Sequence, residues 1–229
     1  MDTVVVLSGG LDSVVLAYLV KARGQSALAI SVDYGQRHAK ELAYARLTAD
    51  RLGMPWRLLD LTAAGIGGLL AGSSLTDEAV PVASAPQTRA GNRSHVVPNR
   101  NALMLALAYT AAATANCRRV AIAVSGTDRP TPDCRPEFLL SFEAMETLAL
   151  DGLATIELFA PFVRRTKEDV VRIGAELGVP WTDTWSCYQG GIRHCGRCLA
   201  CTERREAFAA AGVADPTDYE DSADDENRA

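Results

Sequence analysis

The chain has 229 residues, of which 48% are hydrophobic, and it carries a formal net charge of −5. Its size suits one well-packed core with a small appendage, and its acidic balance does not favour direct binding of nucleic acid. The start, Met-Asp-Thr, has no basic stretch before an apolar run, and no apolar run is long enough to span a bilayer, so we expect a cytoplasmic protein without secretory signal or membrane segment.

Short apolar runs alternate with helix-like segments along the chain. Strands are expected at 3–7, 27–34, 56–61, 118–125 and 155–161, and helices at 12–23, 39–52, 98–115, 135–150, 166–177 and 202–211. Five strand–helix alternations predict an α/β fold, a doubly wound parallel sheet with helices on both faces. Between 62 and 97 the pattern dissolves into Gly, Ala, Ser and Pro, and a stretch of that length predicts a mobile insert or lid over a substrate.

The turn after the first strand reads Ser8-Gly9-Gly10-Leu11-Asp12-Ser13. Ligands of such sheets bind beyond the carboxyl ends of the strands, and glycines there let backbone N–H groups approach an anion. The two serines can donate hydroxyl groups to phosphate oxygens, and Asp12 can cap the helix or hold Mg²⁺. Since the turn lacks the lysine of a Walker A loop, it suits a pyrophosphate that leaves as a unit.

This turn resembles the S-G-G-x-D-S loop of the ATP pyrophosphatase (PP-loop) superfamily, whose fold is adenine nucleotide α-hydrolase-like. The resemblance implies cleavage of ATP between its α- and β-phosphates, with AMP attached to an oxygen of the substrate. It implies an ATP site formed by Leu7, Ser8, Gly9, Gly10, Leu11, Asp12 and Ser13. Val32 and Tyr34, at the end of the second strand, are expected beside the adenine, and Lys167 is expected to act as a counter-charge to the phosphates.

Four of the six cysteines lie close together, at Cys187, Cys195, Cys198 and Cys201. Four thiolates at this spacing predict a closed, structural Zn²⁺ site, with an iron–sulfur cluster as the alternative. Positive charge on Arg193, His194, Arg197 and Arg204 is expected to offset that of the thiolates. Cys117 and Cys134 stand alone and are expected to be small buried apolar residues.

Further motifs follow in order: "VDYGQRH", "SSLT", "VPNRN", "PDCRPEF", "TKEDVVRIGAELGVP" and "TWSCYQGG…HCGRCLACTERREAF". Together they resemble the QueC family, the 7-cyano-7-deazaguanine synthases, over nearly the whole chain. The resemblance implies a zinc-containing, homodimeric ligase that uses ATP and Mg²⁺ to convert 7-carboxy-7-deazaguanine and ammonia, through an amide, to the nitrile. It implies catalytic roles for Asp12, Ser13, Lys167 and Arg100, and substrate binding by Arg100, Asn101, Asp133 and Arg135.

Two departures from the family pattern leave alternatives open. The segment "TDRPTPDC" is shorter than usual and lacks a tyrosine, and Asn99 stands where a glycine is usual. A QueC-like paralogue would pass the activated acid to another amine, for example on a protein. A tRNA-thiolating enzyme would need a basic RNA-binding extension, and a zinc ribbon on an inert nucleotide fold would bind nucleic acid.

Three regions are expected on these grounds. Residues 1–180 form the ATP-binding α/β domain, 181–213 form the zinc-binding loop with the last helix, and 214–229 form an acidic, disordered tail.

Overall fold

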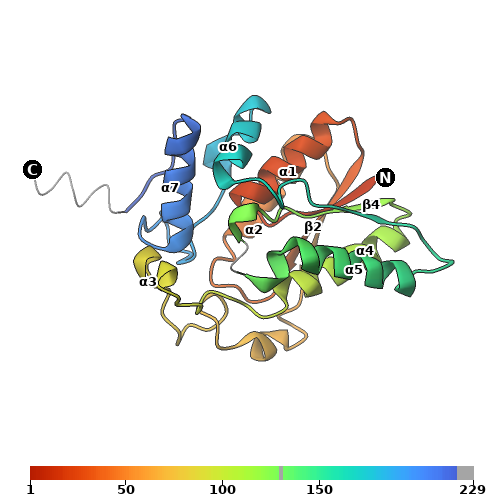
Figure 1. Ribbon diagram of the computed structural model, residues 1–229, viewed down its shortest axis with the longest axis horizontal. Helices are drawn as coiled ribbons and strands as arrows, with labels where there is room; N and C mark the ends of the chain where they lie inside the picture. The colour runs from red at the N-terminus through yellow and green to blue at the C-terminus, as the bar shows by residue number, and fades with distance from the viewer. Residues whose placement is uncertain (129–130, 221–229) are drawn as a thin grey trace, which may run out of the picture.

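The computed structural model describes residues 1–128 and 131–220 (Figure 1). Its sheet has five parallel strands in the order β3-β2-β1-β4-β5, so the predicted doubly wound α/β fold is confirmed. Thr3 of the central strand pairs with Ala27 on one side and Arg119 on the other. The strands are β1 (Thr3–Val6), β2 (Ala27–Asp33), β3 (Trp56–Asp60), β4 (Arg119–Ala121) and β5 (Glu157–Phe159).

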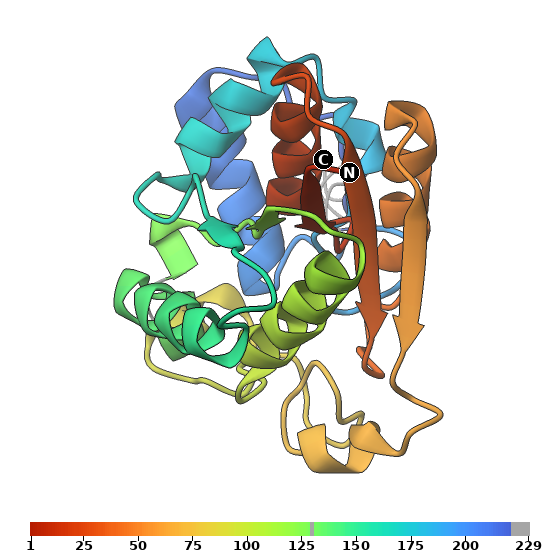
Figure 2. The same cartoon turned by 90° about the vertical axis from the view of Figure 1, so that its right-hand side faces the viewer.

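Alternate residues of β1 point into two separate cores, because successive side chains of a strand face opposite sides. The long helices are α1 (Leu11–Ala22), α2 (Glu41–Leu52), α4 (Arg100–Thr114), α5 (Pro136–Ala149), α6 (Lys167–Glu176) and α7 (Leu199–Ala211). Val5 belongs to a core cluster with residues of α1, α2, α6 and α7, whereas Val4 and Val6 belong to another with residues of α4 and α5. Helices therefore cover both faces of the sheet (Figure 2).

The segment 62–97 is irregular, as predicted, but it is held by local structure. It contains a 3₁₀ turn (Ile66–Leu70) and a short helix, α3 (Ala85–Arg89), which sequence periodicity did not indicate because it is barely longer than one turn. Ser84 and Gln87 form a capping box at its start. Leu75 and Val97 are buried in an apolar cluster with Tyr34, so the segment is anchored beside β2 at Leu75 and at its last residue.

Residues 214–220 were expected to belong to an acidic, disordered tail, but they contact the rest of the protein. Asp215 accepts hydrogen bonds from Arg204 and Tyr219, and His194 and Tyr219 are paired in a β-bridge. These contacts fix residues 214–220 against the cysteine-rich loop, so the expectation of disorder from residue 214 was wrong for them. Residues 221–229 lie outside the described part of the chain.

None of the helices described here combines the length and the apolar character needed to cross a lipid bilayer.

Candidate active site

The loop between β1 and α1 is shaped by its own two hydroxyl groups. The Oγ of Ser13 accepts hydrogen bonds from the N–H groups of Ser8 and Gly9, each at 3.2 Å, and donates to the carbonyl of Gly10 at 3.0 Å. The Oγ of Ser8 accepts from the N–H of Gly10 at 3.1 Å. The hydroxyls that sequence reasoning assigned to phosphate oxygens thus hold the loop in shape, while Ser8, Gly10, Leu11, Asp12 and Ser13 line a cavity.

Gly9 is required by a close approach as well as by its backbone conformation. Its φ is +90°, and a Cβ on it would lie 2.0 Å from the carbonyl oxygen of Glu41 and 2.7 Å from the amide nitrogen of Ala45. Any side chain would therefore drive the loop away from the first turn of α2. Gly9 fixes the position of that helix relative to the loop.

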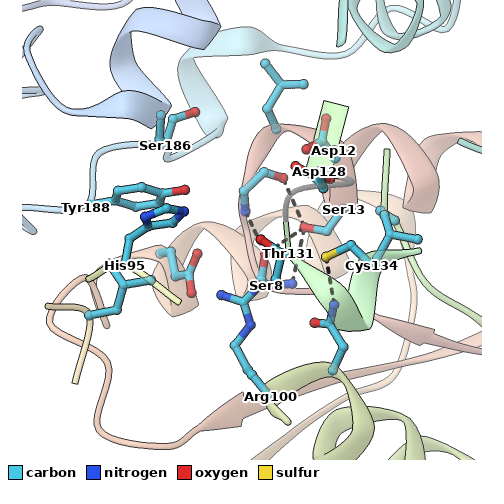
Figure 3. A pocket seen from close by; sticks show the side chains of 18 of the residues that line it. Ser8, Asp12, Ser13, His95, Arg100, Asp128, Thr131, Cys134, Ser186 and Tyr188 are labelled. Carbon is cyan, nitrogen blue, oxygen red and sulfur yellow. Dashed lines mark hydrogen bonds between the residues drawn. The ribbon is translucent and has the colours of Figure 1, made fainter. Parts of the chain in front are cut away.

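A lysine and two acids meet at the start of α1. Lys167 Nζ lies 2.8 Å from one carboxylate oxygen of Asp12 and 3.9 Å from Asp128 (Figure 3 labels both acids). Burial alone would lower the pKa of Lys167, but the Asp12 and Asp128 carboxylates raise it well above its usual value, so the lysine is charged. Asp12 Oδ1 is buried without a hydrogen-bond partner. An orphan carboxylate oxygen beside a second acid is a donor set that fits Mg²⁺.

Glu203 of α7 lines the same cavity and was missed from the sequence. Burial raises the pKa of Glu203 to about 7, although the positive charge of Lys167 acts to lower it. Its position two residues after Cys201 was the available signal. If the cysteine-rich loop packs against the α/β domain, the first turns of the helix that follows this loop lie beside the same cavity.

The cavity has a volume of about 270 Å³ and runs from the loop to an aromatic wall (Figure 3). Tyr34 and Arg100 line it, as the sequence predicted for a ligand site, and Arg100 points towards Ser8. Leu7 and Val32 are instead buried in the apolar clusters beneath the cavity. Their side chains do not line the cavity, so any contact with a nucleotide would come from their backbone groups.

Asn101 and its neighbours form the floor below Arg100. The Asn101 side chain donates to the carbonyl of Asp133 and to the sulfur of Cys134, each at 3.1 Å, and Asp133 accepts from the Asn101 backbone N–H. Asp133 therefore holds the first turn of α4, while Arg135 is exposed at the start of α5, away from the cavity walls. Cys134 is buried as expected, and it also lines the cavity.

Asn99 occupies a left-handed conformation, with φ of +58°. Glycine and asparagine are the residues that adopt this region at least cost. The departure at this position therefore preserves the backbone turn into α4.

The opposite wall carries Glu41, two histidines and Tyr188. The rings of His95 and Tyr188 stack with centroids 6.2 Å apart and planes 13° apart. Burial lowers the pKa of His38 to about 3, so this imidazole is neutral, and it raises the pKa of Glu41 to about 8 against the opposing effect of Arg100. Sequence reasoning missed these residues, although His38 and Glu41 follow β2 at the carboxyl edge of the sheet.

The four clustered cysteines are all buried, and their sulfur atoms lie within 4.8 Å of one another. Cys195 Sγ accepts N–H groups from Arg197 and Cys198 at 3.4 and 3.3 Å. Four converging thiols fit a tetrahedral metal ion, with Cys187, Cys195, Cys198 and Cys201 as ligands. His194 Nε2 instead accepts the backbone N–H of Ser186 at 3.1 Å, so it is committed to the loop that carries Cys187.

The cysteine loop is joined directly to the β1–α1 loop. The backbone N–H of Trp185 donates to the carbonyl of Gly9 at 3.0 Å, and Lys40 lies 4.3 Å from the centre of the Trp185 ring. Arg204, one of the cations expected to offset the thiolates, donates through its guanidinium to Asp215 at 3.1 Å and to Thr184 at 2.7 Å.

The sequence of this chain matches a known family and several named relatives. A model of the family described as queuosine biosynthesis protein QueC matches residues 2–212. A protein from Rhizobium rhizogenes named 7-cyano-7-deazaguanine synthase is 53% identical over 222 residues, which cover 96% of this chain and 93% of that protein. One of the same name from Paracoccus denitrificans is 52% identical over 223 residues, covering 97% and 94%.

A solved structure supports the fold alone. The NMN synthetase of Francisella tularensis superposes with a TM-score of 0.53 and 18% identity, covering 93% of this chain and 78% of its own.

Proposed function

Because this chain belongs to the queuosine biosynthesis protein QueC family, we propose that it is an ATP-dependent carbon–nitrogen ligase that converts 7-carboxy-7-deazaguanine and ammonia to 7-cyano-7-deazaguanine. The observation that carries the proposal is the 53% identity, over more than nine tenths of both chains, with a protein named for that product. The cavity supplies what the chemistry requires: the Ser8–Ser13 loop at one end, an aromatic wall at the other, and the cationic side chains of Lys167 and Arg100 in its lining.

The nucleotide is proposed to bind with its triphosphate over the Ser8–Ser13 loop. Helix α1 begins at Leu11, directly after the glycines of the loop. The N–H groups of its first turn have no partner within the helix and would attract the phosphates. Lys167 contributes a positive charge held in place by Asp12, and electrostatic stabilisation of this kind assists departure of pyrophosphate. Tyr34 at the end of β2 is proposed to lie beside the adenine.

Asp12 and Asp128 are the residues proposed to hold Mg²⁺, Asp12 through its unpartnered Oδ1 and Asp128 through Oδ1, because Ser125 already binds Asp128 Oδ2. The ion would neutralise charge on the phosphate oxygens. Asp12 thereby acts on both the lysine and the ion, which assigns it a catalytic role in positioning the triphosphate.

In the first reaction, a carboxylate oxygen of the substrate attacks the α-phosphorus of ATP, and the bond to the β-phosphate oxygen breaks. Ammonia then attacks the carbonyl carbon of this mixed anhydride, AMP leaves, and the nitrogen loses a proton to give the amide. Arg100 would draw the acid into the cavity and hold it against the loop, so that the reacting atoms are close.

In the second reaction, the amide oxygen attacks a second ATP in the same way. Loss of AMP and of both N–H protons then leaves the carbon–nitrogen triple bond. The same loop, Lys167 and Arg100 serve both reactions, because each begins with a substrate oxygen at the α-phosphorus.

Zinc is proposed as the metal of the cysteine site, with a structural role. Four thiol ligands leave no open position for a substrate. Its contribution would reach the reaction through Trp185, whose backbone N–H holds the carbonyl of Gly9 in the phosphate loop. A homodimer and the use of free ammonia are proposed from the family resemblance and are testable by size-exclusion chromatography and by ammonium dependence.

The test is incubation of the protein with ATP, Mg²⁺ and 7-carboxy-7-deazaguanine, with and without ammonium, followed by mass spectrometry. Formation of the nitrile only with ammonium supports the proposal. Consumption of the acid without amide or nitrile, but with a mass increase on an added amine or protein, would favour the paralogue that transfers the acid elsewhere.

A further inference from the structure

Glu41 is a buried acidic residue that lines the cavity beside the β1–α1 loop. It is the first residue of α2, only 8% exposed, and its Oε2 lies 4.0 Å from the position that a Cβ on Gly10 would take. Burial disfavours the charged form of its carboxyl group, and hydrogen bonds from N–H donors would favour that form. Such a group is retained at a cost unless a ligand supplies hydrogen-bond donors to it.

The neighbours of Glu41 do not meet that need. His38 Nε2 lies 3.5 Å away, beyond a good hydrogen bond, and this imidazole is neutral. Burial raises the pKa of Glu41, and the Arg100 charge and the Gln36 side chain oppose that rise. The pKa of about 8 indicates that these contacts do not compensate for the burial.

The substrate class of the proposed function has donors of the required kind. The six-membered ring of a 7-deazaguanine presents, in order along one edge, an amino group, a ring N–H and a carbonyl oxygen. A carboxylate accepts two N–H donors in one plane, and a guanidinium donates to a carbonyl, as arginine does to the O6 of guanine. The adenine edge offers an amino group beside an unprotonated ring nitrogen, which a carboxylate repels.

The inference rests on the proposed function and deepens it. We propose that Glu41 and Arg100 together recognise the pyrimidinone edge of the substrate, Glu41 accepting from the 2-amino group and ring N–H, and Arg100 donating to the ring carbonyl. The flat bicycle then lies along the aromatic wall of His95 and Tyr188. On this ring system the 7-carboxylate is next to the carbonyl that Arg100 would bind. Because Arg100 points towards Ser8 (Figure 3), the carboxylate would also lie on the Ser8 side of the cavity.

A purely structural role for Glu41 makes different predictions. A carboxylate in the first turn of a helix interacts favourably with the helix dipole, and its loss then lowers stability and ATP binding together. Recognition of the ring edge instead changes the affinity for the acid and the discrimination between purine-like edges. It leaves thermal stability and nucleotide affinity close to those of the parent protein.

The experiment is calorimetric titration of the full-length wild type, Glu41→Gln and the exposed control Glu176→Gln. Each receives ATP, 7-carboxy-7-deazaguanine, or the same acid without its 2-amino group. We expect wild type and control to prefer the amino-bearing acid by about tenfold or more, since hydrogen bonds to charged groups are strong. Glu41→Gln should lose about tenfold to a hundredfold in affinity for that acid, should no longer discriminate between the two acids, and should bind ATP as before.

Other outcomes overturn the assignment in distinguishable ways. If the wild type binds neither acid, the proposed function and this inference both fail. If the wild type binds and converts the acid but Glu41→Gln discriminates as well as the control, only the role of Glu41 fails. If Glu41→Gln loses ATP instead of the acid, this end of the cavity holds the adenine.

Discussion

Replacing Gly9 with alanine should disrupt the phosphate loop more than a comparable change elsewhere. The new Cβ would lie 2.0 Å from the carbonyl oxygen of Glu41, both atoms being fixed by backbone. The left-handed conformation costs a non-glycine residue about 1–2 kcal/mol, and overpacking adds about 1–3 kcal/mol. We therefore expect Gly9→Ala to lose about 2–5 kcal/mol of unfolding free energy and to bind ATP poorly.

Gly24 offers a matched control, because its φ is +70° and a Cβ there would meet nothing within 4 Å. Gly24→Ala carries the conformational cost without the collision. Thermal unfolding followed by circular dichroism should place Gly9→Ala below Gly24→Ala by about 3–10 °C, the shift expected for about 1–3 kcal/mol in a chain of this size. Equal melting temperatures, or undiminished ATP binding by Gly9→Ala, would refute the argument that this glycine sets the loop against α2.

Three further predictions concern the charged and metal-binding groups. Lys167→Met should lower kcat/KM, measured by steady-state AMP formation, by about a hundredfold or more. The substitution removes the positive charge that would stabilise the leaving pyrophosphate, and it leaves Asp12 without its ion-pair partner. Cys198→Ser should lower the zinc content found by mass spectrometry and the melting temperature together, and retention of full zinc would count against the four-thiol site. Arg204→Met should cost about 3–5 kcal/mol in chemical denaturation because Asp215 is left unpaired, and an unchanged midpoint would contradict that contact.

The fold and the two principal sites were predictable because each has a local signature. Apolar strands buried on both faces read as continuous runs, and β1 is such a run. The loop after it was recognised from its glycines and hydroxyls, and the cluster of four cysteines that could hold a metal ion from their spacing. In each case residues that act together are neighbours in sequence.

The remaining features depend on contacts between distant segments. Two examples are the hydrogen bond from Trp185 to Gly9 and the burial of Arg204 against Asp215. Both depend on how the cysteine-rich loop packs, and the spacing of residues in the sequence does not indicate that packing. Glu41 reads as an ordinary acidic residue in the first turn of a helix, and only the close approach of Gly9 reveals that it borders the loop. The ordered part of the tail was missed because its composition is that of a solvated end.

The central claim is that a substrate oxygen is joined to the α-phosphorus of ATP on the Ser8–Ser13 loop. It is tested most directly with 7-carboxy-7-deazaguanine carrying ¹⁸O in its carboxylate, in the presence of ATP, Mg²⁺ and ammonium. The account predicts that ¹⁸O appears in the released AMP and that the remaining phosphates leave as pyrophosphate. Unlabelled AMP, or ADP and inorganic phosphate in its place, would contradict it.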